Sequence, residues 1–187
     1  PATANTSNAG VVLLRSSTTS NSGVRVQTTQ PLISGAGLMF RAVFALPSSV
    51  ANRTMRVGFH DSTTQADATD GMYFEIANLT VSAKTANNAT RTTSPTTATL
   101  TAGTYYVFDI YQVDASTIRF VVINYTTKAS LLDVNITTNI PTSDIARAFF
   151  AGLVGTVSGT TASNIVNLDY MGFGPSKPSF VQVPFNG

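Results

Sequence analysis

Three aspartates, one histidine and one tyrosine lie close together in the sequence and have the chemistry of a binding site. Asp61, Asp67 and Asp70 place three of the nine acidic residues of the chain in one short segment, between His60 and Tyr73. Carboxylate oxygens are the hard ligands that calcium prefers. They also accept hydrogen bonds from sugar hydroxyls, and a tyrosine ring can stack on a sugar face. We therefore expect glycan or calcium binding at these five residues. The simpler alternative is a hydrophilic loop whose aspartates only cap turns.

The residues needed for catalysis are mostly missing. Glu75 is the only glutamate, whereas glycoside hydrolysis uses two carboxylates that face each other. Nothing in the sequence places Asp109 opposite Glu75. His60 is the only histidine, and no serine lies in a nucleophile-elbow sequence. A zinc site needs more such ligands. We therefore predict that the chain is not an enzyme and has no cofactor apart from calcium at the three aspartates.

The composition excludes several classes of partner. Charged residues make up 11% of the chain, the net charge is +2, and the basic residues are scattered. The sequence therefore has no electrostatic footprint for nucleic acid, and no apolar run approaches the length of a membrane span. The chain contains no cysteine, which excludes disulfides. The polar surface must come from Thr, Ser and Asn, which suits a symmetric assembly or a protein outside a cell.

The segments that position these residues are predicted to be β-strands. Short runs with apolar residues at every second position follow one another, with turn residues between them and no helical stretch. This pattern indicates an all-β sandwich or barrel, of which we predict the sandwich. The predicted strands are Val11–Leu14, Val24–Thr28, Leu38–Leu46, Thr54–His60, Met72–Ala77, Thr80–Thr85, Tyr105–Val113, Thr117–Asn124, Leu131–Thr137, Arg147–Leu153 and Ile165–Gly172.

Alternation assigns one side of each strand to the core. The phenylalanines predicted to point inward are Phe40, Phe44, Phe59, Phe74, Phe108 and Phe120. Several strands are apolar on their second side as well, at Val43, Val121 and Ile123. Either another layer of the same chain or a neighbouring subunit must cover that side. We expect an interface in a homotrimer, shared with Phe180 and Phe185 of the C-terminal segment.

The length of the chain fits one folded domain. We expect residues 1–10 to be a flexible lead-in, residues 11–173 to form the single β-sandwich, and residues 174–187 to be an extended, proline-rich C-terminal arm. Proline keeps such an arm extended while its aromatic residues favour burial. The arm lies on a partner or packs on its own domain.

Five short segments of the sequence follow one another in an order that resembles a known fold family. They are Met55–Thr63 (MRVGFHDST), Asp70–Ile76 (DGMYFEI), Gly103–Ile110 (GTYYVFDI), Ile118–Val122 (IRFVV) and Asn167–Met171 (NLDYM). Their order resembles the laminin-G/concanavalin-A-like jelly roll, in the version found in bacteriophage tail-fibre and virion surface proteins. The resemblance implies two curved antiparallel sheets and a role in glycan binding, cell attachment or oligomer building. The chain departs from glycan-binding members in lacking tryptophan, the common sugar-stacking residue.

Together these observations predict a non-enzymatic surface protein of a bacteriophage virion, for tail-fibre receptor binding or capsid decoration. The expected partners are other copies of the chain, other virion proteins and a host surface glycan, and the expected location is the extracellular virion surface. A secreted bacterial carbohydrate-binding module is the alternative. A glycan hydrolase with the same fold is a remote third hypothesis, because hydrolysis needs two facing carboxylates and the chain has only one glutamate.

Overall fold

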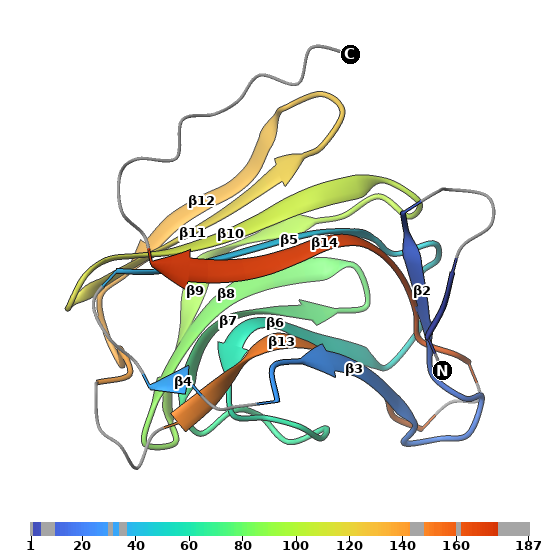
Figure 1. Cartoon of the computed structure of the whole chain (residues 1–187), viewed down its shortest axis with the longest axis horizontal. Helices are drawn as coiled ribbons and strands as arrows, with labels where there is room; N and C mark the ends of the chain where they lie inside the picture. The colour runs from blue at the N-terminus through green and yellow to red at the C-terminus, as the bar shows by residue number, and fades with distance from the viewer. Residues whose placement is uncertain are drawn as a thin grey trace.

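The computed structural model describes residues 2–4, 10–29, 32–33, 37–142, 148–159 and 162–175. Within these ranges all regular structure is β, in two antiparallel sheets that face each other (Figure 1). Sheet A has the strand order β1 (Ala2–Ala4), β2 (Val12–Arg15), β14 (Ile165–Pro175), β5 (Leu38–Ala45), β10 (Tyr105–Asp114), β11 (Thr117–Asn124) and β12 (Ser130–Ile136). Sheet B has the order β3 (Gly23–Gln27), β13 (Ala148–Val157), β6 (Arg53–His60), β7 (Gly71–Ala77), β8 (Thr80–Asn87) and β9 (Thr90–Thr99), with β4 (Leu32–Ile33) also paired to β13.

The predicted all-β sandwich is confirmed, with differences at a few strands. The sequence predicted a flexible lead-in where β1 pairs with β2. It predicted a strand that ends at Leu153, but β13 continues to Val157. Strand β9 was not predicted, because its threonine-rich sequence has no apolar alternation. The structure describes β14 as far as Pro175, so most of the predicted C-terminal arm lies outside the described residues.

The core lies between the two sheets and is built around aromatic rings. The six phenylalanines predicted to point inward are at most 1% exposed. Phe44 and Phe108 stack within sheet A with ring centroids 4.3 Å apart. Phe74 of sheet B meets Phe108 and Phe120 edge-on, each at 5.3 Å. Phe74 therefore joins the two sheets at the centre of the sandwich.

The sheets approach closely enough at β6 to require a glycine. Gly58 has a φ of 137°, a region that residues with a side chain rarely adopt. A Cβ atom at this position would lie 2.5 Å from Ile110 Cδ1 and 2.8 Å from the Met72 carbonyl oxygen. The position thus excludes any side chain, because both the backbone angle and the space oppose it.

The outer face of sheet A changes one expectation about subunit contacts. Val43 is 6% exposed and Val121 is 7% exposed in the single chain. In the register of the sheet Val43 lies between Val107 and Tyr170 on the neighbouring strands, so a valine and a larger tyrosine flank it. Both valines are therefore buried without a partner subunit, and their place in a subunit interface stays a prediction.

The remaining predicted interface residues give no further support to a trimer. Ile123 is partly buried in the same face, while Phe180 and Phe185 lie outside the described residues. The trimer stays a prediction that the structure does not test. No helix in the described ranges has the length and apolar character needed to cross a membrane.

Strand β9 closes one edge of sheet B in an irregular way. The register between β8 and β9 shifts between Ser82 and Lys84. At this irregularity the Ala83 N–H donates to the side-chain oxygen of Ser94 rather than to a carbonyl, at 3.1 Å. Pro95 follows and is exposed. The end of the sheet is therefore bulged and carries a residue without an N–H group.

Candidate functional site

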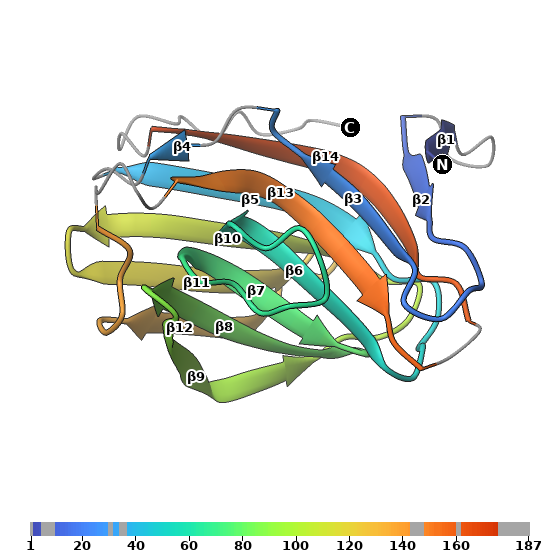
Figure 2. The same cartoon turned by 90° about the horizontal axis from the view of Figure 1, so that it is seen from below.

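The outer face of sheet B carries a cluster of charged side chains. Alternation along the strands places Arg56, Tyr73, Glu75 and Lys84 on the side away from the core, since Arg56 pairs with Glu75 and Tyr73 pairs with Lys84 in the register. The segment of residues 61–70, which links β6 to β7, lies in front of these strands in Figure 2. We call this segment the covering loop.

Four charged side chains form a closed ring on this face, which we call the ionic ring. Arg56 Nε lies 3.2 Å from Asp67 Oδ1, and Arg56 Nη2 lies 3.2 Å from Glu75 Oε2. Lys84 Nζ lies 3.3 Å from Asp67 Oδ2 and 2.7 Å from Glu75 Oε1. The Tyr73 hydroxyl also donates to Asp67 Oδ1 at 2.7 Å. Asp67 therefore fixes the covering loop to the face of the sheet.

The ring keeps Asp67 ionised. Burial acts to raise the pKa of Asp67, but the hydrogen bond from Tyr73 and the positive charges of Lys84 and Arg56 outweigh it and lower the pKa to about 2. Burial and the bond to Asp67 together raise the pKa of Tyr73 far above its usual value. The carboxylate and the phenol thus stay in one protonation state over the physiological range.

The two other aspartates of the loop bind backbone groups. Asp61 Oδ1 accepts a bond from the Thr69 N–H at 2.8 Å, and Asp70 Oδ1 accepts one from the Asn88 N–H at 2.8 Å. The structure therefore unites Asp67 with Tyr73, while Asp61 and Asp70 shape the turns. Among the described residues no three acidic, histidine or cysteine side chains lie close enough together to hold a metal ion. Calcium at the three aspartates stays a prediction.

His60 and Tyr73 lie beneath the surface. His60 is 1% exposed and Tyr73 is 0% exposed. The ring of His60 meets that of Tyr73 edge-on at 5.8 Å, and its Nδ1 lies 3.0 Å from the Ser62 carbonyl oxygen. Burial and the nearby charge of Arg56 lower the pKa of His60 to about 4, so the imidazole is neutral near pH 7. In this conformation neither ring can touch a glycan, contrary to the expectation that they line a binding site.

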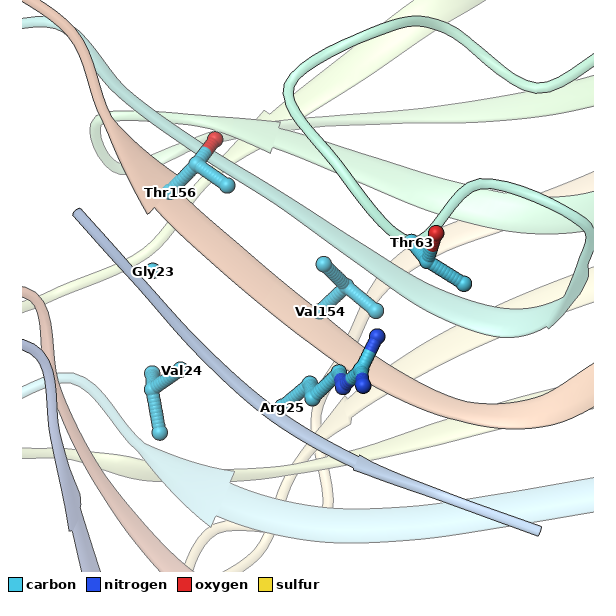
Figure 3. A pocket seen from close by; sticks show the side chains of 6 residues that line it. All are labelled: Gly23, Val24, Arg25, Thr63, Val154 and Thr156. Atoms are coloured by element: carbon cyan, nitrogen blue, oxygen red, sulfur yellow. The ribbon is translucent and has the colours of Figure 1, made fainter. Parts of the chain in front are cut away.

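An open groove lies beside the covering loop and consists of two adjoining hollows of about 220 and 490 Å³. The smaller hollow is lined by Gly23, Val24, Arg25, Thr63, Val154 and Thr156 (Figure 3). The larger one is lined by Asn21, Gly23, Thr63, Thr64, Gln65, Ala66 and Thr156. One wall of the groove is therefore the first half of the covering loop.

The groove offers hydroxyl groups, one cation and an apolar side chain. The Thr63 hydroxyl has no hydrogen-bond partner among the described residues, and the Arg25 side chain points toward Val154 and Thr63 in Figure 3. Gln65 Nε2 donates to Asn21 Oδ1 at 3.1 Å and so links the loop to the turn before β3. Hydroxyl, amide and guanidinium groups beside a valine are suited to a polar ligand with hydroxyl groups.

The sequence did not predict this groove. Arg25, Thr63 and Thr156 lie on three separate elements, and the register of β3 with β13 sets Arg25 beside Val154. Each of these residues is ordinary on its own. Only the order of the strands and the fixed position of the covering loop bring them together.

A family model for the SO2946-like C-terminal domain matches residues 7–169. The chain belongs to this family. Comparison with curated protein sequences gives no match. Among solved structures the chain is similar to the protein of unknown function SO2946 from Shewanella oneidensis MR-1, with a TM-score of 0.69 and 17% identity over 92% of this chain and 72% of that one.

Two further structures show the type of fold. The chain is similar to a legume lectin-like domain from Entamoeba histolytica, with a TM-score of 0.63 and 10% identity over 94% of this chain and 87% of that one. It is also similar to the endo-β-1,4-glucuronan lyase of the fungus Trichoderma reesei, with a TM-score of 0.57 and 16% identity over 94% of this chain and 86% of that one. The lectin-like jelly roll expected from the sequence is therefore confirmed.

Proposed function

We propose that this domain is a non-catalytic carbohydrate-binding module that holds a glycan in the groove beside the covering loop. The observation that carries the proposal is the lining of the groove. The guanidinium of Arg25 and the Thr63 hydroxyl, which has no partner among the described residues, line one hollow, and Gln65, already bonded to Asn21, lines the adjoining one. The fold is shared with a legume lectin-like domain and a glucuronan lyase, which supports a carbohydrate ligand. Fold alone does not assign one.

The state of the acidic groups supports binding rather than catalysis. A general acid must hold a proton near the working pH, whereas Asp67 is ionised down to about pH 2. Glu75 meets both Arg56 and Lys84. Tyr73 and His60, two further groups that can exchange a proton, are buried. None of the described residues that line the groove is an aspartate, a glutamate, a histidine or a tyrosine, which supports a binding role for it.

A pair of matched variants tests the binding site. We expect Thr63→Val to weaken glycan binding about 5-fold, the effect of losing one neutral hydrogen bond. Thr97→Val is the control, because Thr97 is exposed on β9 at the opposite edge of the same sheet. A glycan array with the full chain would identify the ligand, and titration calorimetry would measure both variants. Equal losses in the two variants, or no glycan bound at all, would contradict the proposal.

We also propose a setting for the module, namely the surface of a bacteriophage particle, as part of a tail fibre or as a capsid decoration. The support is the composition, with 11% charged residues, and the exposed threonines of β9, which make the outer surface polar without net charge. Immunogold labelling of purified particles tests this setting, and light scattering tests the trimer. Absence of label from particles, with the protein found free in the medium, would favour a secreted bacterial module instead.

A further inference from the structure

The arginines on the outer face of sheet B differ in their partners. Arg56 meets Asp67 and Glu75, and the Nε of Arg91 lies 3.4 Å from Asp67 Oδ2. Arg25 has no ion pair or hydrogen bond with any described residue, although it is exposed and lines the groove. Among the described residues no carboxylate pairs with Arg25, in contrast to Arg56 and Arg91.

The nearby acidic groups are already engaged elsewhere. Asp67 and Glu75 belong to the ionic ring. Asp61 accepts a bond from the Thr69 N–H. A guanidinium in a hollow whose described lining holds no carboxylate raises the local concentration of anions. The groove therefore favours a negatively charged ligand over a neutral one.

We propose that Arg25 binds the anionic group of an acidic sugar unit, so that the glycan of the proposed function is a negatively charged polysaccharide. This inference rests on that function and specifies its ligand. The planar guanidinium matches a carboxylate or a sulfate with two parallel hydrogen bonds. The Thr63 hydroxyl lies on the side of the groove toward which Arg25 points and binds a hydroxyl of the same unit (Figure 3).

The shape of the groove favours a polymer over a single sugar. The hollow at Arg25 adjoins the larger one, and the two share Gly23, Thr63 and Thr156 in their linings. A chain of linked units can therefore pass from Arg25 to the region of Asn21 and Gln65. The neutral amides and hydroxyls there suit the uncharged part of the polymer.

The test measures binding of the full chain to four polymers. They are polygalacturonate, which carries carboxylates, dextran sulfate, which carries sulfates, neutral dextran, and single-stranded DNA, which carries phosphates. We expect binding to polygalacturonate or dextran sulfate, weakened by added salt. The first two polymers distinguish the two sources of negative charge.

Three variants assign that binding to one side chain. We expect Arg25→Gln to weaken it about 10- to 100-fold, the range for a lost charge-assisted hydrogen bond. Arg25→Lys keeps the charge but loses the planar fork, and we expect an intermediate loss. Arg15→Gln is the control with the same change of charge, because Arg15 is exposed on β2 of sheet A. Melting curves establish that the variants are folded.

Each outcome decides the inference. Loss of acidic-polymer binding in Arg25→Gln, with Arg15→Gln unchanged, supports it. Undiminished binding of the acidic polymer in Arg25→Gln overturns it. Binding of neutral dextran by the wild type as tightly as the acidic polymers, undiminished in Arg25→Gln, overturns it and leaves the proposed function standing. Binding of DNA alone, or of no polymer and no arrayed glycan, overturns both.

Discussion

The outer faces of the two sheets arrange their ion pairs in different ways. On sheet A, Arg41 meets Asp109 with Nε 2.7 Å from Oδ1, and Arg119 meets Asp133 with Nη2 2.7 Å from Oδ2. Each pair joins two adjacent strands, and the two pairs share no charged residue. On sheet B the ionic ring combines three strands with Asp67, which comes from the covering loop.

The Arg119–Asp133 pair differs from the ionic ring in burial, and both pairs of sheet A differ from it in which segments they hold together. The side chains of Arg119 and Asp133 are 49% and 45% exposed, while those of Arg56 and Lys84 are 6% and 13% exposed. Exposed pairs contribute little stability, whereas breaking a buried pair is costly. The loop fixed by the ring also forms a wall of the groove. On sheet A the ion pairs link only neighbouring strands. On sheet B they hold in place the covering loop, which forms one wall of the groove.

The largest effect is expected in the core that both faces share. Phe74→Ala removes the ring that contacts Phe108 and Phe120 across the sandwich. We expect a loss of about 3–5 kcal/mol in the free energy of unfolding, because a buried ring leaves a cavity. Urea denaturation measures it. An unchanged midpoint would show that β7 is assigned to the wrong register.

The next effect separates the two faces. Asp67→Asn removes one anion of the ionic ring and leaves Arg56 and Lys84 sharing Glu75. We expect a loss of about 2–4 kcal/mol, because the buried guanidinium loses a charged partner. The covering loop would also lose protection from hydrogen exchange at the Ala68 N–H, which bonds to Asp67. A cost equal to that of an exposed pair would remove the distinction between the faces.

A third effect depends on pH. The pKa of His60 is about 4 in the folded chain, below its ordinary value of 6.5. The unfolded chain therefore binds the proton more readily, so stability falls as the pH drops from about 6.5 to about 4. We expect a loss of about 2–3 kcal/mol over this window. Because His60 is the only histidine, His60→Gln should flatten the slope between pH 7 and pH 5. An unchanged slope in that variant would show that another group titrates there.

The smallest effect is expected on sheet A. Asp133→Asn breaks the pair with Arg119, whose side chains are about half exposed. We expect less than about 1 kcal/mol, and less still at high salt, because solvent and ions screen the pair. Thermal melts at low and high salt measure both quantities. A loss as large as that of Asp67→Asn would make the two faces equivalent.

The sequence alone predicted most of the strands and the core, since a period of two is visible along those strands. All six inward phenylalanines followed from that rule. Strand β9 was not predicted, because its threonines and Pro95 give no alternation of apolar and polar residues. The acidic cluster of Asp61, Asp67 and Asp70 was visible as a group, but its role was not.

The role depends on contacts made at long range. The partners of Asp67 lie on other strands, at Arg56 and Lys84, and nothing local distinguishes it from its two neighbours. The groove depends on the pairing of β3 with β13, which brings Arg25 beside a strand more than a hundred residues later. Such neighbours follow from the strand order, which alternation alone does not specify.

Pro95 has a consequence for how this domain behaves when many copies are crowded together. An edge strand with free N–H and C=O groups invites a strand from another molecule to add on, and repeated addition leads to aggregation. At β9 the bulge and the proline interrupt that row, so a foreign strand cannot pair along its whole length. Sheet B therefore offers a poor template for a foreign strand at this edge, which lowers the tendency of crowded copies to join there.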